Sequence, residues 1–405
     1  MNICVVTHTF PRNEGDIAAA FMKEFCDALV ENGQKVILIT PFDQKFNRRG
    51  DRFKIVTYKY IWPDKFHLLG YSRTMEADVE LKWWVFFLIP FMSFFGTLAL
   101  FKIVRREKID IINAHWIIPN GLMSMIVSKL TGVPYVITLP GTDAYLATRF
   151  KIIGWISKII ARYSDGVFSN SSLHLERILK LGFKPKYKGV ISYPSDVSRF
   201  KPSKEGIDVI RKRHRIKSSE IIVLAVGRLV YKKGFDYLIK ALVPLKHYSL
   251  KLLIGGEGDL KLNWQKLVAR LGLLDKVLFV GEIKRNEIAY YYNLADIIVA
   301  PSIIDKKGNV DGGPVVCFES MACGKPQIVT NVLGIADIIK NGINGFVIPQ
   351  KSSGAITQAL EKLIKSKKLR EKMGEENKRL VKLNLSTKAI GKIYLNYFME
   401  IALKN

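Results

Sequence analysis

Two cations that follow one predicted strand could bind a phosphorylated ligand. The segment GRLVYKKG places Arg228 and Lys233 on a single strand-to-helix loop, directly after the β-rich run 221–227. Ligands of open parallel sheets bind beyond the carboxyl ends of the strands, so this loop lies where a ligand is expected. Fixed cations can hold a diphosphate while its charge grows during bond cleavage. One such loop is not specific, because most surface Arg and Lys side chains are simply solvated.

The segment DGGPVVCFESMACGKPQIV predicts a short helix whose first turn faces a ligand. Gly312 and Gly313 free the backbone, Pro314 suits the first helical turn, and Gly324 followed by a proline ends the helix. Unpaired N–H groups at a helix start form a natural seat for phosphate. The sequence therefore predicts an anion site at this helix start.

Two carboxylates accompany this helix. Glu319 is the only charged residue within it, and its neighbours at four-residue spacing, Val315 and Cys323, are apolar. A lone carboxylate on an apolar face is costly unless it accepts hydrogen bonds. A ribose diol could donate them, and the alternative is an internal pair with a buried Arg. Asp311, eight positions earlier in the loop, can reach a sugar hydroxyl.

Further candidates follow other predicted strands. In the Gly255-Gly256-Glu257-Gly258 loop the backbone can approach a ligand closely, although the loop could also be a simple turn. In the first half, Gly15 precedes a helical run and presents backbone N–H groups. His115, Gly141 and Asp143 follow strand candidates and are predicted to contact substrate. A lone histidine is often structural, so both interpretations of His115 remain open.

The composition predicts two globular domains in a reduced compartment. The chain has 405 residues, 48% of them apolar and 24% charged, which is more than one core usually supports. The four cysteines form no metal-ligand pairs and no leader precedes the strand-like NICVVT, so we expect a cytoplasmic protein without a metal or cofactor. The net charge of +27 attracts polyanions. No nucleic-acid-binding signature is present, so nucleic acid is not an expected partner.

The run WWVFFLIPFMSFFGTLALF is long enough to span a bilayer as a helix. Strand-like segments before and after it look like parts of one sheet, which argues against spanning. Tryptophans at one end and basic residues at the other suit a membrane interface. We prefer a helix near residues 83–104 that dips into an anionic membrane face, and a buried core helix is the alternative.

Short β-rich runs, each followed by a helical stretch, recur along the whole chain and predict parallel sheets covered by helices. The polar passage 193–206 is the best linker candidate. We therefore expect a first domain over 1–197, a second over 198–385, and a last helix over 386–405 that docks back on the first domain. The predicted strands are 3–7, 36–40, 109–114, 135–139, 166–170 and 189–192, then 221–227, 252–255, 277–281, 296–302, 327–330 and 345–349.

These motifs together resemble the family-four glycosyltransferases over nearly the full chain. The order VGRLVYKKGFDYLIKAL, GGEGDL, FVGEI, DGGPVVCFESMACGKPQIV and NGFVIP carries the resemblance. Within it, Asp311 and Glu319 match the family's pair of carboxylates separated by seven residues, with aspartate in the first place.

The resemblance implies a GT-B fold, an α/β architecture of two doubly wound Rossmann-like domains facing a cleft. It implies retention of anomeric configuration, no metal, and a nucleotide-diphosphate sugar as donor. Arg228 and Lys233 would hold the diphosphate, Glu319 the ribose and Asp311 the transferred sugar. The remaining implied contacts are the backbone of Gly312, Gly313, Pro314, Val315 and Val316 around the sugar, the segment with Gly281 and Glu282 at the base, and Gly15 over the diphosphate.

One position departs from the family pattern. Many members carry a histidine before Gly-Ser/Thr-Asp, whereas this chain has Pro140 in TLPGTD. The contact to the donor sugar at that position is therefore in doubt, and with it the sugar preference.

The resemblance implies a transferase of hexose-type sugars acting on a glycan or lipid-linked acceptor, peripheral on the cytoplasmic membrane face. The acceptor hydroxyl would attack the face from which the diphosphate leaves, and a phosphate oxygen would take the proton. Two alternatives are a nucleotide-sugar epimerase and a non-catalytic sugar- or lipid-binding partner of a transferase complex.

Overall fold

The structure is a computed structural model, and it describes residues 1–14, 16, 19–70, 87–194, 200–306, 308 and 315–404. The chain divides into unit 1, Met1–Pro194 together with Thr387–Asn405, and unit 2, Ser195–Ser386. The first division falls inside the passage 193–206 that we predicted as a linker. Unit 1 is thus built from two separate stretches of the chain.

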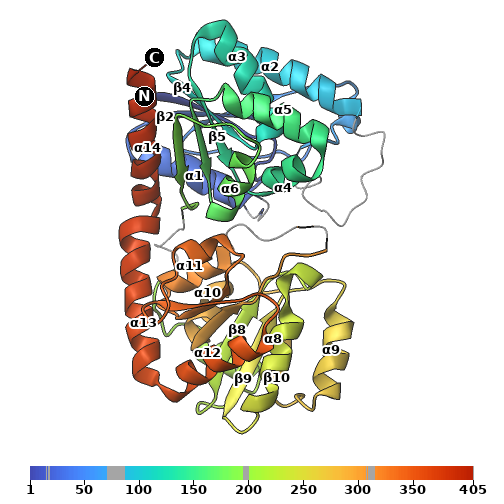
Figure 1. Ribbon diagram of the computed structural model, residues 1–405, viewed down its shortest axis with the longest axis vertical. Coiled ribbons are helices and arrows are strands. Elements are labelled where there is room, and N and C mark those ends of the chain that lie inside the picture. Colours follow the sequence, from blue (N-terminus) through green and yellow to red (C-terminus); the bar gives the residue numbers. More distant parts are fainter. Residues whose placement is uncertain are drawn as a thin grey trace. The chain divides into compact units, whose positions relative to one another are not determined.

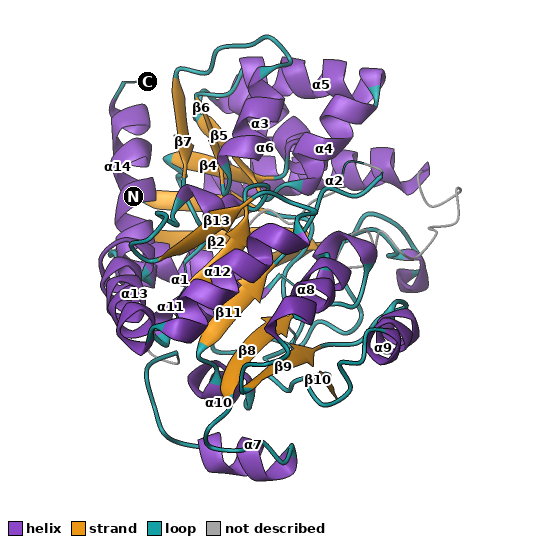
Figure 2. Cartoon of the chain, turned by 60° about the horizontal axis from the view of Figure 1, so that its bottom comes forward, coloured by secondary structure: helices purple, strands orange, loops and turns teal. Residues whose placement is uncertain are grey.

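Unit 1 contains a parallel sheet of seven described strands, in the order β3-β2-β1-β4-β5-β6-β7 (Figure 2). Most of its central strands are fully buried runs of Val, Ile and Leu, as expected when helices cover both faces. The strands are β1 Asn2–Val6, β2 Lys35–Pro41, β3 Lys54–Tyr58, β4 Ile111–His115, β5 Tyr135–Leu139, β6 Gly166–Ser169 and β7 Tyr187–Val190.

Helices cover both faces of this sheet (Figure 1). Helices α2, α3 and α5 lie on one face, and α1 and α14 on the other. The helices of unit 1 are α1 Ala20–Glu31, α2 Leu88–Arg106, α3 Leu122–Thr131, α4 Thr142–Arg149, α5 Lys151–Arg162, α6 Ser172–Leu179 and α14 Thr387–Leu403, with short turns at Asp64–Phe66 and Ile117–Gly121.

The last helix packs against the first. A Cβ placed on Gly391 of α14 would lie 2.3 Å from the carbonyl oxygen of Ala28 in α1, so the two backbones approach very closely. The amide of Asn32, which follows α1, donates to the carbonyl of Lys388 at 3.0 Å. The prediction that the C-terminal helix returns to the first domain is confirmed.

Unit 2 repeats the architecture with a parallel sheet of six described strands, in the order β10-β9-β8-β11-β12-β13. Its strands are β8 Ile221–Val226, β9 Leu250–Gly255, β10 Val277–Gly281, β11 Ile297–Ala300, β12 Gln327–Thr330 and β13 Gly345–Ile348. Its helices are α7 Ile207–Arg213, α8 Phe235–Ala241, α9 Lys261–Arg270, α10 Ile288–Leu294, α11 Val315–Ala322, α12 Ser353–Lys365 and α13 Lys367–Leu380, with short turns at Tyr231–Lys233, Val243–Leu245, Gly334–Asp337 and Val381–Leu385.

The apolar run forms α2, which begins at Leu88, while residues 83–86 lie outside the described part of the chain. The strands on either side of α2, β3 and β4, belong to one sheet, as the argument against spanning required. One side of α2 packs into the core through residues such as Met92 and Leu100. By length and composition alone the helix could cross a membrane, and only 33% of its most apolar window is buried. One side of α2 therefore fits the interpretation as a core helix, and the other side fits the interpretation as a surface helix.

Candidate functional site

Loops at the carboxyl ends of β8, β9 and β10 join into one backbone platform in unit 2. Gly227 N–H donates to the Gly255 carbonyl at 2.9 Å, and Gly256 N–H donates to the Gly281 carbonyl at 2.7 Å. Gly256 has φ 131°, and a Cβ there would lie 2.1 Å from the Gly227 carbonyl oxygen. Because no side chain fits, the two loops stack backbone on backbone. The glycine loop is thus more than a turn between strands.

Lys233 lies over this platform. A Cβ placed on Gly227 would lie 2.8 Å from Lys233 Cε, so the lysine side chain passes directly above the glycine. The next residue, Gly234, has φ 64° and directly precedes α8, and a Cβ there would lie 2.2 Å from the Pro301 carbonyl oxygen. This tight start of α8 fixes Lys233 at the carboxyl ends of the strands. Arg228 sits on the same loop with an exposed side chain, so the structure brings the two predicted phosphate-binding cations to one edge of the sheet.

Glu319 is buried in α11, and Arg285 and Tyr292 of unit 2 are among its hydrogen-bond partners. Arg285 Nη1 donates to Glu319 Oε1 at 2.6 Å, and the Tyr292 hydroxyl donates to Oε2 at 2.7 Å. The guanidinium of Arg285 also lies 5.6 Å from the centre of the Phe200 ring. Burial and the charge of Glu319 raise the pKa of Tyr292 well above its usual value, so the phenol stays a donor.

The internal arginine pair that the sequence left open for Glu319 is therefore present, with Arg285 half-buried rather than enclosed. A carboxylate oxygen accepts more than one hydrogen bond, so the arrangement is compatible with a further donor. Ribose binding by Glu319 stays a prediction.

Several predicted residues at the start of α11 lie outside the described part of the chain. These are Asp311, Gly312, Gly313 and Pro314. Gly15 of the first domain also lies outside the described part of the chain. Of the remaining two, Val315 is exposed and Val316 half-buried at the first turn of α11. The phosphate seat at this helix start stays a prediction.

A residue that sequence reasoning missed lies just after the predicted base-binding segment. Gly281 ends β10 with φ 74°, Glu282 is exposed, and Arg285 follows in the same loop. The rule that functional side chains follow strands could have identified Arg285 from its place after β10. Tyr292 carried no such signal, because it lies inside α10 among apolar residues.

In unit 1, His115 is a core residue. It is the last residue of β4, and its side chain is 0% exposed. Nδ1 lies 3.1 Å from the Tyr193 hydroxyl, and the ring packs edge-on against Phe25 of α1. Burial lowers the pKa of His115 to about 3, so the imidazole is neutral. The structural interpretation of His115 is therefore the one that the geometry favours, since its side chain turns into the sheet packing and away from solvent.

Asp143 connects two loops at the carboxyl edge of the unit 1 sheet. Oδ1 accepts from the backbone N–H groups of Ala144 at 3.0 Å and Gly141 at 3.3 Å, and Oδ2 accepts from Ile117 N–H at 3.2 Å. Burial raises the pKa of Asp143 to about 6 despite these hydrogen bonds. Its carboxylate fixes the loops that follow β4 and β5, which are the loops where we predicted substrate contacts.

The loop with the unusual proline is held by residues that follow β6. The Asn170 side chain donates to the Pro140 carbonyl at 3.1 Å. Gly141 has φ 132°, and a Cβ there would lie 2.7 Å from Nε2 of His174 in α6. An imidazole therefore does pack against this loop, and it comes from α6.

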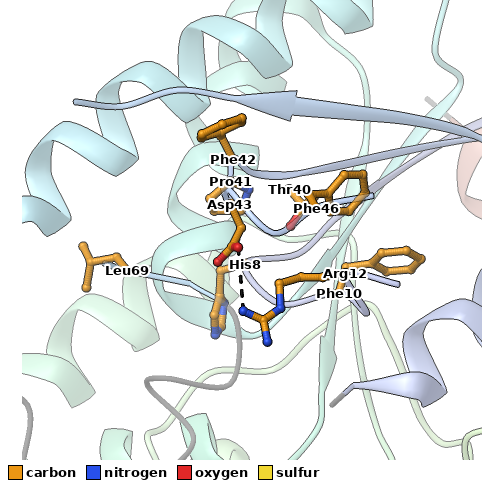
Figure 3. Close-up of a pocket in the computed structure, with 9 residues that line it drawn as sticks. All are labelled: His8, Phe10, Arg12, Thr40, Pro41, Phe42, Asp43, Phe46 and Leu69. Atoms are coloured by element: carbon orange, nitrogen blue, oxygen red, sulfur yellow. Dashed lines mark ion pairs between the residues drawn. The ribbon is translucent and has the colours of Figure 1, made fainter. Parts of the chain in front are cut away.

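A small pocket opens at the carboxyl ends of β1 and β2 (Figure 3). Burial lowers the pKa of His8 to about 4, and Asn120 Nδ2 lies 3.0 Å from His8 Nδ1. Because Nδ1 faces an amide donor, the neutral ring carries its proton on Nε2. Arg12 pairs with Asp43 at 3.7 Å beside it. The pocket is lined by His8, Phe10, Arg12, Thr40, Pro41, Phe42, Asp43, Phe46 and Leu69.

Among the described residues, no group of three or more His, Cys, Asp or Glu side chains could hold a metal ion. The four cysteines are buried and unpaired by disulfides.

Comparisons with known proteins give the family of the chain. The family model for glycosyl transferases group 1 matches residues 206–380, and the model for glycosyltransferase family 4 matches residues 18–199. An uncharacterized glycosyltransferase of Methanocaldococcus jannaschii is 25% identical, covering 98% of each chain. The UDP-Gal:alpha-D-GlcNAc-diphosphoundecaprenol alpha-1,3-galactosyltransferase of Escherichia coli is 26% identical over 67% of this chain and 70% of its own.

Solved structures share the fold. Sucrose-phosphate synthase of Thermosynechococcus elongatus superposes with a TM-score of 0.76 at 18% identity, covering 100% of both chains. Alr3699/HepE of Anabaena, solved in complex with UDP, has a TM-score of 0.74 at 16% identity over 99% of this chain and 100% of its own. The two family models together cover most of the sequence, and these neighbours give the architecture as GT-B. The chain therefore belongs to the family-4 glycosyltransferases.

Proposed function

We propose that the protein is a retaining, metal-independent glycosyltransferase. It moves a hexose-type sugar from a nucleotide-diphosphate sugar to a glycan or lipid-linked acceptor on the cytoplasmic face of an anionic membrane. The observation that carries the proposal is the position of Lys233 over the backbone platform of Gly227 and Gly256. A cation fixed over open backbone, with Arg228 on the same loop, suits a leaving diphosphate.

The chemistry follows from where charge develops. As the bond between the sugar and the diphosphate breaks, negative charge grows on the leaving phosphate, and Lys233 and Arg228 stabilise it. These two side chains supply the charge that a metal ion would otherwise supply. The acceptor hydroxyl attacks from the same face and gives its proton to the leaving phosphate oxygen, so configuration is retained and no protein base is needed. Glu319 binds the ribose, while Asp311 and the start of α11 contact the sugar.

The donor assignment draws support from relatives. The name of the Escherichia coli relative includes a UDP-linked sugar, and the Anabaena neighbour was solved with UDP. The same Escherichia coli name includes a diphosphoundecaprenol acceptor. We assign donor binding to unit 2 and acceptor binding to unit 1, where His8 Nε2–H and Arg12 are candidates for contacting acceptor oxygens.

A membrane surface is proposed for two reasons. Aromatic side chains are exposed on α2 and just before it, with Phe94 of α2 60% exposed and the preceding Phe87 66% exposed. The helix ends in Arg105 and Arg106, and the whole chain carries a net charge of +27. Aromatic side chains with a basic end suit the headgroup region of an anionic bilayer.

The test is a panel of UDP-, GDP- and ADP-linked sugars incubated with the protein, vesicles and EDTA. We expect release of one nucleoside diphosphate, and NMR of the product should show the anomeric configuration of the donor. Inversion, or activity that EDTA abolishes, contradicts the corresponding part of the proposal.

Site variants make the test specific. Lys233→Ala should lower turnover on the order of 100-fold or more, because one charge that stabilises the leaving group is lost. Lys240→Ala is the matched control, since Lys240 pairs with Asp236 on the exposed side of α8. Equal activity of both variants would sink the assignment of Lys233.

A further inference from the structure

Helix α5 exposes two large apolar side chains that packing within unit 1 does not explain. Its inner side, with Gly154 and Ile160, is buried against the rest of the unit. On its outer side, Ile152 is 75% exposed and Trp155 is 65% exposed. Residues three apart lie on one side of a helix, so the two side chains form one outward ridge. Exposed apolar ridges of this kind mark interaction surfaces.

Two neighbouring helices extend this ridge into a wider surface. Helices α2, α3 and α5 cover the same face of the unit 1 sheet (Figures 1 and 2), and Lys129 of α3 lies 3.7 Å from the centre of the Tyr163 ring at the end of α5. We call the outer side of these three helices the apolar face. Its exposed apolar residues are Phe87, Phe91, Phe94, Phe95 and Leu98 at α2, Ile126 and Leu130 of α3, and Ile152 and Trp155 of α5.

The charge on these helices selects the occupant. Within α2, α3 and α5 there is no Asp or Glu, and there are seven basic residues: Lys102, Arg105, Arg106, Lys129, Lys151, Lys158 and Arg162. A surface with apolar residues and cations but no anions complements an anionic bilayer, whose headgroups attract Lys and Arg and whose interface accepts Trp. A second protein would need a matching acidic and apolar surface, and a second copy of this chain would bring like charges together.

We propose that α5 is a second membrane-docking element, which inserts Ile152 and Trp155 into an anionic bilayer beside the aromatic side of α2. The proposal deepens the proposed function, on which it rests for the presence of an acceptor at a membrane. Docking through α2 and α5 together attaches unit 1 to the bilayer at two helices. Lys151 and Arg162, at the two ends of α5, then lie among the lipid headgroups.

The experiment is co-sedimentation of the full chain with vesicles of phosphatidylcholine alone or mixed with phosphatidylglycerol. The test variant is Ile152→Ser with Trp155→Ser. Its matched control is Leu262→Ser with Leu274→Ser, since these leucines of unit 2 are 69% and 73% exposed. We expect wild type and control to bind mixed vesicles alike and more tightly than phosphatidylcholine alone, and the test variant to bind on the order of tenfold more weakly.

A second readout follows Trp155 itself. Brominated lipids should quench part of the wild-type tryptophan fluorescence, and Trp155→Phe should reduce that quenched part. Unchanged vesicle binding by the test variant overturns the proposal, and so does a quenched part that Trp155→Phe does not reduce. Light scattering could also show that wild type is a dimer and the test variant a monomer. That result would overturn the proposal and make the apolar face a self-association surface.

The proposed function is tested separately by calorimetry with nucleotide sugars in the absence of vesicles. Donor binding should be the same for wild type and the test variant. If wild type binds vesicles but no donor, the proposed function fails and the docking surface stands. If wild type binds donor but the substitutions in α5 do not change vesicle binding, only the docking proposal fails.

Discussion

Removing one hydroxyl group, in Tyr292→Phe, tests the hydrogen-bond network around Glu319. The Tyr292 side chain is 0% exposed, and its hydroxyl donates to a carboxylate that is 3% exposed. Phenylalanine keeps the ring packing, so the change removes the hydrogen bond without opening a large cavity. Arg285 still donates to the other oxygen of the carboxylate in this variant.

The magnitude follows from the charge of the acceptor. A hydrogen bond to a charged group contributes ~1.5 to ~3 kcal/mol, and water does not easily replace the lost donor at a buried carboxylate. We therefore expect the free energy of unfolding of unit 2 to fall by that amount. Because the pKa of Tyr292 is raised well above its usual value, the hydroxyl stays protonated and the loss should not vary between pH ~7 and ~9.

Hydrogen–deuterium exchange of peptides from β8 and β11 reports on unit 2 by itself. The expected loss corresponds to exchange roughly 10- to 100-fold faster in these protected strands. The control is Tyr248→Phe, whose hydroxyl also bonds to a carboxylate, Glu361, but at the surface, where water replaces it. Exchange that is equally fast in both variants, or unchanged in Tyr292→Phe, would refute the reasoning that burial makes this hydrogen bond strong.

Three further predictions concern backbone packing and titration. Gly256→Ala should lower stability by ~1 to ~3 kcal/mol because its φ is 131° and its Cβ would meet a carbonyl oxygen, whereas Gly354→Ala, with open space around it, should be neutral or stabilising in urea unfolding. Asp143 has a raised pKa, so the stability that its protonated form contributes is present at low pH and is lost as the pH rises through about 6. The free energy of unfolding of Asp143→Asn relative to wild type should therefore rise by up to ~3 kcal/mol between pH 3.8 and about 6. A difference between the two proteins that does not change with pH contradicts this prediction. Gly391→Leu should separate α14 from α1 and expose α14 to limited proteolysis, while protection equal to wild type argues against close packing.

Most of the fold could be predicted from the sequence because buried parallel strands consist of short runs of Val, Ile and Leu. Strands β5, β10 and β12 match their predicted ranges. The strand that was missed, β3, is KIVTY, a half-buried edge strand whose neighbours are charged, so no continuous apolar run marked it.

The candidate site could be predicted in position but only partly in its partners. The rule that ligands bind beyond strand ends placed Lys233 and the glycine loop correctly at one edge, because that edge is set by topology. The burial of His115 and the pairing of Glu319 with Arg285 depend on side chains that are far apart in sequence. The sequence showed that Glu319 needed donors, but it could not show which of them the fold supplies.

The return of α14 to unit 1 has a consequence for the order in which the protein is made. Residues Thr387–Asn405 are synthesised after all of unit 2, yet they cover α1, which is among the first elements to leave the ribosome. During synthesis, α1 therefore keeps an uncovered apolar side, while Ser195–Ser386 already forms a complete folding unit. Unit 2 can therefore finish folding before unit 1 is complete, although it follows most of unit 1 along the chain.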